Sequence, residues 1–317
     1  MKTCVLTGFA GFIGYHFAKR LLADGWLIYG VDINPDSYNG KHIQFDQNFK
    51  LIGRDICDLK ELPDCDYVFH LAAQTHVHNS IQDCKEFIRT NIEGTRNLLE
   101  LIKNKSENIL QKPTMVYFST DEVYGDIEEG FATEEFPLAP TNNYAVTKAA
   151  ADQLVQSYGR TYGMDYLIIR PTNNYGTHQN SEKFIPLTLK LHLMGKKVKL
   201  HNRGTPVRNW LHVEDTCDAV LHILEKGFSK GCQQIYNVGG NLSQINYETA
   251  RQIFMALNTF DFHAELDLES HRPGQDMRYA VDCSKLLETN WKWKKEFQDS
   301  LPKIVQWYLD DPVRRLF

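Results

Sequence analysis

The chain has 317 residues, of which 42% are hydrophobic and 24% are charged, and its formal net charge is −5 at pH 7. This composition is typical of a globular protein and excludes a largely disordered chain, while the acidic balance argues against a nucleic-acid-binding surface. The length suffices for one large α/β unit with a lobe, or for two domains.

The cysteines and the N-terminal sequence indicate the cellular compartment of the protein. Seven cysteines form no C-x-x-C pair and leave an odd one over, so we expect reduced thiols rather than a disulfide framework. The chain leads almost at once into a predicted strand over residues 3–7 and lacks the pattern of a signal peptide. No apolar run reaches membrane-spanning length. We therefore expect a cytoplasmic protein without a membrane or nucleic-acid partner.

A glycine-rich turn follows the first predicted strand. Its spacing is G-x-x-G-x-x-G, and apolar residues then recur at helical intervals. Such a turn lets the backbone approach a pyrophosphate, whose charge lies at the helix N-terminus. Glycines also occur in ordinary turns, so the spacing alone does not decide between the two. The predicted cofactor contacts in this turn are Gly8, Gly11, Phe12, Ile13 and Gly14.

A second predicted strand, residues 27–31, is followed by Asp32, eighteen residues after Gly14. A carboxylate at this place can accept hydrogen bonds from both ribose hydroxyls of an adenosine, and it repels a 2′-phosphate. The next residues, Ile33 and Asn34, offer no arginine to offset that charge. The pattern favours NAD as the cofactor, with NADP as the minor alternative, and all three residues are predicted to line its site.

Two later segments are also predicted to lie beside the cofactor. Asp55 and Ile56 follow a short strand and could face the adenine, although a loop-capping aspartate explains Asp55 equally well. Residues 68–73 have the pattern of a buried strand that ends in small residues, which let a cofactor come close. The predicted contacts there are Leu71, Ala72, Ala73 and Thr75.

The histidines near this strand do not have the spacing of metal ligands. His70, His76 and His78 have no acidic or cysteine partner at a suitable interval, so we predict no metal site and interpret them as wall residues. A long helix is predicted over residues 81–102. On it, Thr90 and its neighbour Asn91 either face the cofactor or pack.

Two adjacent carboxylates follow the next apolar run, residues 115–118. Thr120, Asp121 and Glu122 come at its end, and Tyr144 and Lys148 follow on a helical pattern whose four-residue spacing places them on one face. The ammonium can then favour the ionised phenol, which makes a base. Two carboxyls beside that base exceed what simple hydride transfer requires and indicate an elimination. The alternative, that the carboxylates merely cap the next helix, suits an isolated pair better.

The regular alternation of strands and helices ends after residue 171. We predict an α/β fold with a Rossmann-type doubly wound parallel sheet over residues 1–171, to which residues 207–239 return. Residues 172–206 and 240–317 are predicted to form a smaller C-terminal lobe that binds the substrate.

The motifs along nearly the whole chain resemble those of the extended short-chain dehydrogenase/reductases, and within them the dTDP-glucose 4,6-dehydratases. STDEVYG is the most informative motif, because related 4-epimerases usually carry small residues in place of Asp121 and Glu122. The resemblance rests on TGFAGFIG at 7–14, HLAAQTHVHNS at 70–80, STDEVYG at 119–125, YAVTK at 144–148, NNYG at 173–176, EKFIP at 182–186, VRNWLHVED at 207–215 and HRPGQDMRYAVD at 271–282.

The resemblance implies a division of labour among the catalytic residues. Tyr144 removes the proton of the sugar 4-hydroxyl, with Lys148 favouring its phenolate and Thr120 hydrogen-bonded to the same oxygen. Glu122 then removes the C5 proton, and protonated Asp121 donates to the departing 6-hydroxyl. The two neighbouring carboxyls must therefore hold different protonation states.

The resemblance also implies a nucleotide-sugar site in the lobe. Arg208 and Arg272 are the expected diphosphate partners, because guanidinium offers paired donors to phosphate oxygens, with a surface salt bridge as the alternative. The other implied substrate contacts are His76, Thr120, Asn173, Lys183, Phe184, Lys199, Leu200, His201 and Asn246.

Departures from the family pattern affect recognition of the base. The chain has His78 and Asn79 where Asp-Arg is frequent, and Asn209 and Gln275 where Asp and His are common. UDP-glucose or another NDP-hexose is therefore a second candidate beside dTDP-glucose. The same fold could also serve a sugar-nucleotide 4-epimerase or a non-catalytic NAD-binding scaffold. The family usually forms a homodimer through the helices predicted at 81–102 and 144–160, with core packing as the competing explanation of their small residues.

Overall fold

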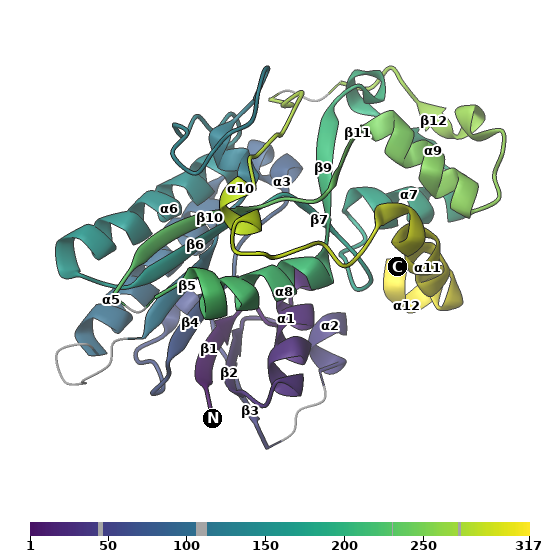
Figure 1. The fold of residues 1–317 in the computed structure, drawn as a ribbon. Helices are drawn as coiled ribbons and strands as arrows, with labels where there is room; N and C mark the ends of the chain where they lie inside the picture. Colours follow the sequence, from purple (N-terminus) through teal and green to yellow (C-terminus); the bar gives the residue numbers. More distant parts are fainter. Residues whose placement is uncertain (44–46, 106–112, 230, 272–273) are drawn as a thin grey trace.

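The protein is described by a computed structural model covering residues 1–43, 47–105, 113–229, 231–271 and 274–317. Within these ranges seven parallel strands form one sheet in the order β3-β2-β1-β4-β5-β6-β10 (Figure 1). This order confirms the predicted doubly wound Rossmann-type fold. The strands are β1 (Thr3–Thr7), β2 (Leu27–Asp32), β3 (Phe49–Gly53), β4 (Tyr67–His70), β5 (Thr114–Phe118), β6 (Tyr166–Pro171) and β10 (Gln233–Val238).

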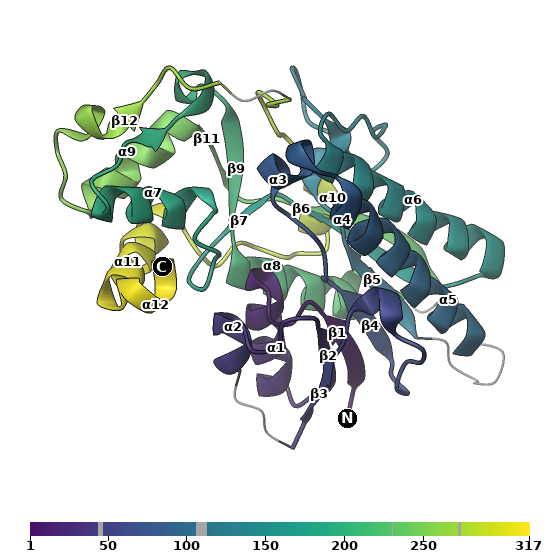
Figure 2. The ribbon, with the colours of Figure 1, turned by 180° about the vertical axis from the view of Figure 1, so that it is seen from behind.

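Helices cover both faces of this sheet, as Figures 1 and 2 show from opposite sides. Both faces of the inner strands are therefore buried, in keeping with the largely apolar sequences of β1, β5 and β6. On one face lie α1 (Phe12–Ala23) and α8 (Val213–His222), and on the other α5 (Thr95–Lys105) and α6 (Asn143–Tyr162).

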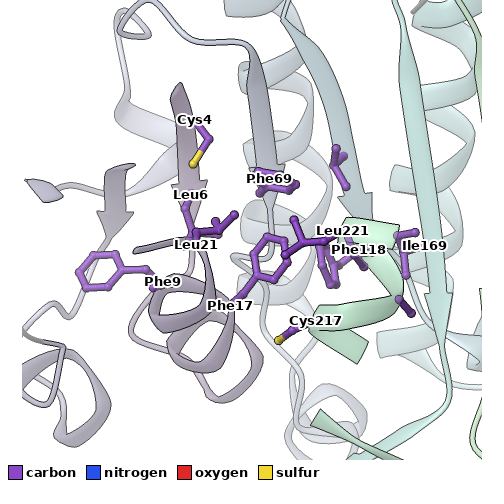
Figure 3. Close-up of a cluster of buried hydrophobic side chains, with 14 of the residues drawn as sticks. Cys4, Leu6, Phe9, Phe17, Leu21, Phe69, Phe118, Ile169, Cys217 and Leu221 are labelled. Carbon is purple, nitrogen blue, oxygen red and sulfur yellow. The ribbon is translucent and has the colours of Figure 1, made fainter. Parts of the chain in front are cut away.

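The core between the sheet and α1 with α8 is built from aliphatic and aromatic side chains (Figure 3). Phe17 of α1 packs edge-on against Phe69 of β4 and Phe118 of β5. This packing fixes α1 against the strands whose carboxyl ends carry the predicted site. The labelled members of the cluster are Cys4, Leu6, Phe9, Phe17, Leu21, Phe69, Phe118, Ile169, Cys217 and Leu221.

The segment predicted as one helix over 81–102 is interrupted, so that prediction is wrong in detail. It consists of α3 (Val77–Gln82), α4 (Lys85–Phe87), a π-helical turn over Ile88–Gly94 and α5. A π turn inserts one residue without reversing the apolar face, so periodicity alone does not reveal it. The short helix α2 (Tyr38–Lys41) lies beside α1 (Figure 1).

A smaller lobe lies beside the carboxyl ends of the sheet (Figures 1 and 2). It contains a three-stranded sheet in the order β11-β9-β7 and a two-stranded sheet, β12-β8, in the described part of the chain. Its elements are β7 (Asn173–Tyr175), α7 (Phe184–Leu193), β8 (Val198–Lys199), β9 (Val207–His212), β11 (Leu242–Ile245), α9 (Asn246–Ala256), β12 (Leu266–Asp267), α11 (Phe297–Asp310) and α12 (Pro312–Leu316).

The returning segment is divided between the two parts. β10 pairs with β6 in the main sheet and α8 packs on α1, whereas β9 pairs with β7 and β11 in the lobe. The helix α10 (Ser284–Leu287) contributes Leu286 to the core under α8. The exact division at residues 171, 207 and 239 stays a prediction.

No helix in the described ranges is both long and apolar enough to cross a membrane.

Candidate active site

The glycine turn and the end of β4 meet at the carboxyl edge of the sheet. Gly8 has φ +72°, and a Cβ there would lie 2.6 Å from the backbone nitrogen of Ala72. A Cβ on Gly14 would lie 2.0 Å from the carbonyl oxygen of Gly8. Glycine is therefore required at both places by close packing of the backbone. Gly11 is the N-cap of α1, and Phe12, Ile13 and Gly14 form its first turn.

The carboxylate of Asp32 lies at the end of β2 beside this turn. Its two oxygens accept hydrogen bonds from the backbone nitrogens of Ala10, at 3.0 Å, and Asn34, at 2.9 Å. Burial raises the pKa of Asp32, and these backbone donors act against that rise. The side chain of Ile33 is 73% exposed. The helix N-terminus, the glycine turn and the carboxylate of Asp32 lie at one edge of the sheet, and together they fit a dinucleotide.

Asp55 is engaged by the chain itself. It caps the 3-10 helix Ile56–Asp58 by accepting a hydrogen bond from the nitrogen of Cys57 at 2.8 Å, and it pairs with Arg89 at 2.5 Å. Burial acts to raise its pKa, but Arg89 and Cys57 outweigh it and lower the pKa of Asp55. Ile56 is buried in the core. The structure therefore shows the capping alternative for Asp55, and contact with an adenine stays a prediction.

His70 is a buried wall residue. Its ring nitrogens hydrogen-bond Thr7 at 2.8 Å and Thr95 at 2.9 Å, and burial, followed by the charge of Lys148, lowers its pKa to about 3. Among the described residues no group of three or more His, Cys, Asp or Glu side chains is placed to hold a metal ion.

The loop after β4 contacts a distant segment, residues 182–183. The carbonyl oxygen of Thr75 accepts a 2.8 Å hydrogen bond from Lys183, and His76 lies 3.7 Å from Glu182. These contacts bring Thr75, His76 and Lys183 together.

Asn91 joins the same loop to α6. Its side-chain oxygen accepts a 2.8 Å hydrogen bond from the backbone nitrogen of Gln74. Its side-chain nitrogen donates to the carbonyl oxygen of Gln74 at 3.1 Å and to the hydroxyl of Thr147 at 2.9 Å. Asn91 therefore packs, which was one of its two predicted roles. Its neighbour Thr90 lies in the π-helical turn.

The two carboxyls that follow β5 differ in environment. Thr120 caps the 3-10 helix Asp121–Tyr124, so that its hydroxyl accepts from the nitrogen of Glu122 at 3.3 Å and donates to Asp121 at 3.2 Å. Asp121 is buried, and its Oδ2 has no hydrogen-bond partner in the described structure. Burial, followed by the charge of Glu122, raises the pKa of Asp121 to about 7. Asp121 therefore keeps its proton up to about pH 7, well above the range in which an ordinary aspartate ionises.

Glu122 is held from two sides. Its Oε2 accepts a hydrogen bond from the amide of Asn142 at 3.1 Å and lies 3.3 Å from the hydroxyl oxygen of Tyr279. The same Asn142 caps α6 by accepting from the nitrogen of Ala145 at 2.9 Å. Neither contact was identified from the sequence. Asn142 stands where an N-cap is expected before a helical pattern, which is a usable signal, whereas Tyr279 lies 157 residues from Glu122.

Tyr144 and Lys148 lie on the inner face of α6. Tyr144 is buried and hydrogen-bonded to Thr120, and burial, with the charges of Glu122 and Asp121, raises its pKa. Lys148 donates to the carbonyl oxygen of Phe118 at 2.5 Å, and burial lowers its pKa to about 7. The predicted lowering of the Tyr144 pKa by Lys148 is therefore not what the chain alone produces, because burial of both groups dominates.

The predicted substrate residues of the lobe occupy several elements. Arg208 of β9 is buried, lies 4.2 Å from the ring centre of Tyr279 and donates to the carbonyl oxygens of Val207 and Asp276. It is thus no surface salt bridge. The Oδ1 of Asn173 is buried without a partner in the described residues. Arg272 lies outside the described residues.

The remaining predicted contacts differ in exposure. Leu200 belongs to the lobe core, so its side chain is committed to packing. His201 hydrogen-bonds Ser270 at 3.0 Å. Lys199 is the exposed end of β8, Phe184 opens α7 after Lys183, and Asn246 opens α9.

Comparison with known proteins places this geometry in a family. The NAD dependent epimerase/dehydratase family matches residues 4–239. A dTDP-glucose 4,6-dehydratase of Haemophilus influenzae is 35% identical over 98% of this chain and 98% of its own length. A trifunctional protein of Arabidopsis thaliana, named as a UDP-glucose 4,6-dehydratase, 3,5-epimerase and reductase, is 35% identical over 98% of this chain and 48% of its own length.

A solved structure agrees over the same span. DesIV, a dTDP-glucose 4,6-dehydratase from Streptomyces venezuelae with NAD and TYD bound, has a TM-score of 0.89, 33% identity and 98% coverage of both chains. These findings confirm the resemblance predicted from the motifs: the chain belongs to the NAD dependent epimerase/dehydratase family.

Proposed function

We propose that this protein is an NAD-dependent nucleotide-sugar 4,6-dehydratase that converts dTDP-glucose, or a related NDP-glucose, to the 4-keto-6-deoxy sugar with loss of water. The observation that carries the proposal is the pair Asp121 and Glu122. A buried carboxyl with its pKa raised to about 7 adjoins one that is held by the amide of Asn142 and contacted by the hydroxyl of Tyr279, so an acid and a base stand side by side.

Each residue has a definite task in this proposal. When bound, NAD supplies the redox chemistry, taking a hydride from C4 of the sugar and returning it to C6. Tyr144 takes the proton of the 4-hydroxyl, and Thr120 orients that phenol. The C4 ketone acidifies the C5 proton, which Glu122 removes while Asp121 protonates the departing 6-hydroxyl.

The electrostatics of Tyr144 place a condition on this scheme. Burial and two carboxyls raise its pKa, so its ionised form depends on nearby positive charge. Protonated Lys148 and the nicotinamide ring are the two proposed sources. Since the pKa of Lys148 is lowered to about 7, its contribution diminishes above neutral pH.

Different residues are proposed to bind different parts of the dinucleotide. The turn at Gly8, Gly11 and Gly14 takes the pyrophosphate, and Asp32 takes the ribose hydroxyls. A 2′-phosphate would face the Asp32 carboxylate, which supports NAD over NADP. The small side chains of Ala72 and Ala73 are proposed to leave room for the cofactor at the end of β4.

The base of the nucleotide is the least constrained part of the proposal. The dTDP-glucose dehydratase and the trifunctional UDP-glucose protein match this chain at the same identity, so UDP-glucose is the second candidate substrate. Arg208, Asn173, Lys183 and Asn246 are proposed to hold the nucleotide sugar, as part of a wider lobe site.

A product assay tests the proposal. The purified protein is incubated with dTDP-, UDP-, GDP- and CDP-glucose, and a 4-keto-6-deoxy product is detected by its absorbance in alkali and by its mass, which is lower by one water. We expect conversion to be fastest with dTDP-glucose. An epimer of unchanged mass would instead assign a 4-epimerase, which uses Tyr144 but has no need of Asp121, and binding of NAD without conversion would assign a scaffold.

We further propose a cytoplasmic homodimer. All seven cysteines are free, which suits a reducing compartment. Apolar side chains are exposed on α6, at Val146 and Tyr162, and on the neighbouring segment, at Ile81 and Ile88. Light scattering after size exclusion tests this assembly. Val146→Asp should yield monomers, whereas an equally exposed apolar site in the lobe, Met255→Asp, should leave the mass unchanged.

A further inference from the structure

The hydroxyl of Tyr279 lies between two carboxyl groups. It is 2.7 Å from Oδ2 of Asp276 and 3.3 Å from Oε2 of Glu122. A tyrosine has one hydroxyl proton, so it can donate a strong hydrogen bond to only one of them. The shorter contact assigns that proton to Asp276. The hydroxyl oxygen, with its lone pairs, is then left toward Glu122.

The surroundings fix this orientation. Both oxygens of Asp276 lie within 2.8 Å of the hydroxyl of Thr141, and Asp276 is buried. The guanidinium of Arg208 lies over the ring of Tyr279 at 4.2 Å and donates to the carbonyl oxygen of Asp276 at 2.9 Å. Burial, followed by the charge of Glu122, raises the pKa of Tyr279, so its hydroxyl stays protonated and remains a donor.

We propose that Tyr279, held by Asp276, is a positioning residue that accepts a hydrogen bond from Glu122 once Glu122 has taken up the substrate proton. The inference rests on the proposed function, in which Glu122 is the base. While Glu122 is a carboxylate, its oxygen faces the lone pairs of Tyr279 over a long contact. After protonation a continuous chain forms, from Glu122 to Tyr279 and from Tyr279 to Asp276.

This arrangement favours the later state of the proton transfer over the earlier one. Interactions that strengthen as the reaction proceeds lower the barrier, whereas interactions equal in both states do not. Asn142 has the opposite preference, because its NH2 group can only donate and bonds a carboxylate more strongly than a protonated carboxyl. Asn142 and Tyr279 therefore act in opposite directions on proton transfer to Glu122, and the titratable groups that interact with Glu122 are Asp121, Tyr144 and Tyr279.

The step balances without a further reactant. The C5–H bond breaks and its proton goes to Oε2 of Glu122. The electron pair forms the C5–C6 double bond as the C6–O bond breaks, and the leaving oxygen takes the proton of Asp121 and departs as water. Tyr279 only exchanges hydrogen-bond partners and transfers no proton to the sugar.

Tyr279→Phe tests the inference, because it retains the ring under Arg208 and removes only the hydroxyl. We expect kcat for product formation to fall about ten- to hundredfold, the range for a hydrogen bond to a group that gains or loses charge, with KM within about twofold. Reduction of the bound cofactor on mixing with substrate should keep its wild-type rate, so the reduced form accumulates at 340 nm. Exchange of the C5 proton with D2O, followed by mass spectrometry, should slow in parallel with kcat.

Two further variants sharpen the test. Tyr236→Phe is the matched control, since Tyr236 is also buried and donates to a backbone carbonyl, that of Gly227 at 2.9 Å, outside the site; it should retain wild-type turnover. Asp276→Asn offers Tyr279 a weaker, uncharged acceptor and should slow the same step by a smaller factor.

The outcomes separate the two proposals. Failure of the wild-type protein to form a 4-keto-6-deoxy product from any of the four nucleotide sugars overturns the proposed function. With wild-type conversion established, unchanged kcat in Tyr279→Phe overturns the role of Tyr279 alone. Equal slowing of cofactor reduction and of product formation in that variant also overturns it, because a general structural role has that signature.

Discussion

The side-chain amide of Asn142 donates a 3.1 Å hydrogen bond to Oε2 of Glu122, while its carbonyl oxygen caps α6, the helix that carries Tyr144. One side chain therefore sets both the start of the helix and the position of the proposed base. Fixing two reacting groups to one anchor limits their relative motion, and misplacement of catalytic groups by about 1 Å is costly.

Replacing Asn142 should separate these two tasks. Asn142→Ser keeps a good N-cap but loses the amide donor, so we expect the free energy of unfolding to change by less than about 0.5 kcal/mol while kcat falls about tenfold. Urea unfolding and the product assay measure the two effects. Asn142→Ala should lose a further ~1 kcal/mol of stability. Equal kcat in the wild type and in Asn142→Ser would contradict the proposed contact with the base.

Glu122→Gln should stop the reaction after oxidation at C4. The amide has almost the shape of the carboxylate but cannot remove the C5 proton, so the bound cofactor should accumulate in its reduced form on addition of substrate. Stopped-flow absorbance at 340 nm follows this species, and product formation should fall by at least about a hundredfold. Glu129→Gln, at an exposed position nearby, serves as the control. Unchanged turnover would remove Glu122 from the mechanism.

Tyr144→Phe should block the reaction one step earlier. Without the phenol there is no base for the 4-hydroxyl, so neither reduced cofactor nor product is expected. The same absorbance measurement distinguishes it from Glu122→Gln, in which the reduced form appears. Cofactor reduction at the wild-type rate in Tyr144→Phe would refute its assignment as the first base.

The raised pKa of Asp121 makes a prediction about stability and pH. The folded-state pKa of about 7 lies above the ordinary value of 3.8, so ionising Asp121 destabilises the folded state progressively as pH rises between these values. Asp121→Asn removes this penalty. We expect the variant to be more stable than the wild type by roughly 2–4 kcal/mol at pH 8 and equally stable at pH 4. Urea unfolding at both values measures it, and equal stability at pH 8 would show that the pKa of Asp121 is not raised in the folded state. Product formation by the wild type should fall above pH 7 as this acid ionises.

A pair of glycines can isolate the cofactor turn. Gly8 and Gly25 both have positive φ, +72° and +75°, but only at Gly8 does a Cβ meet other atoms, with Ala72 at 2.6 Å. Gly25→Ala should cost about 1 kcal/mol of stability and leave NAD affinity unchanged. Gly8→Ala should cost more and weaken NAD binding at least tenfold by calorimetry. Equal NAD affinity in the two variants would argue against a cofactor at this turn.

Local patterns predicted the groups that are close in sequence. Asp121 and Glu122 follow a strand, and Tyr144 and Lys148 share one helix face, so strand ends and helical spacing sufficed to bring out the proposed catalytic set. The doubly wound sheet followed from the same alternation. Asp55 could not be decided from spacing, because its partner Arg89 lies 34 residues away.

Contacts between the sheet and the lobe could not be predicted from the sequence. The contact of Tyr279 with Glu122 spans 157 residues and depends on how the lobe packs against the carboxyl ends of the strands. The pKa values of Tyr144 and Lys148 were likewise hidden, because spacing shows that two groups are neighbours but not how deeply both are buried.

The hydrogen bonds of Asn91 limit which segments can be exchanged between this protein and its relatives. Its amide clamps the backbone of Gln74 and also holds Thr147, one residue before Lys148. Asn91 thus links the loop after β4 to α6, the helix that carries the proposed base Tyr144. A chimera that takes only one of these segments from a relative would lose the hydrogen bonds between them, so the two segments should be exchanged together.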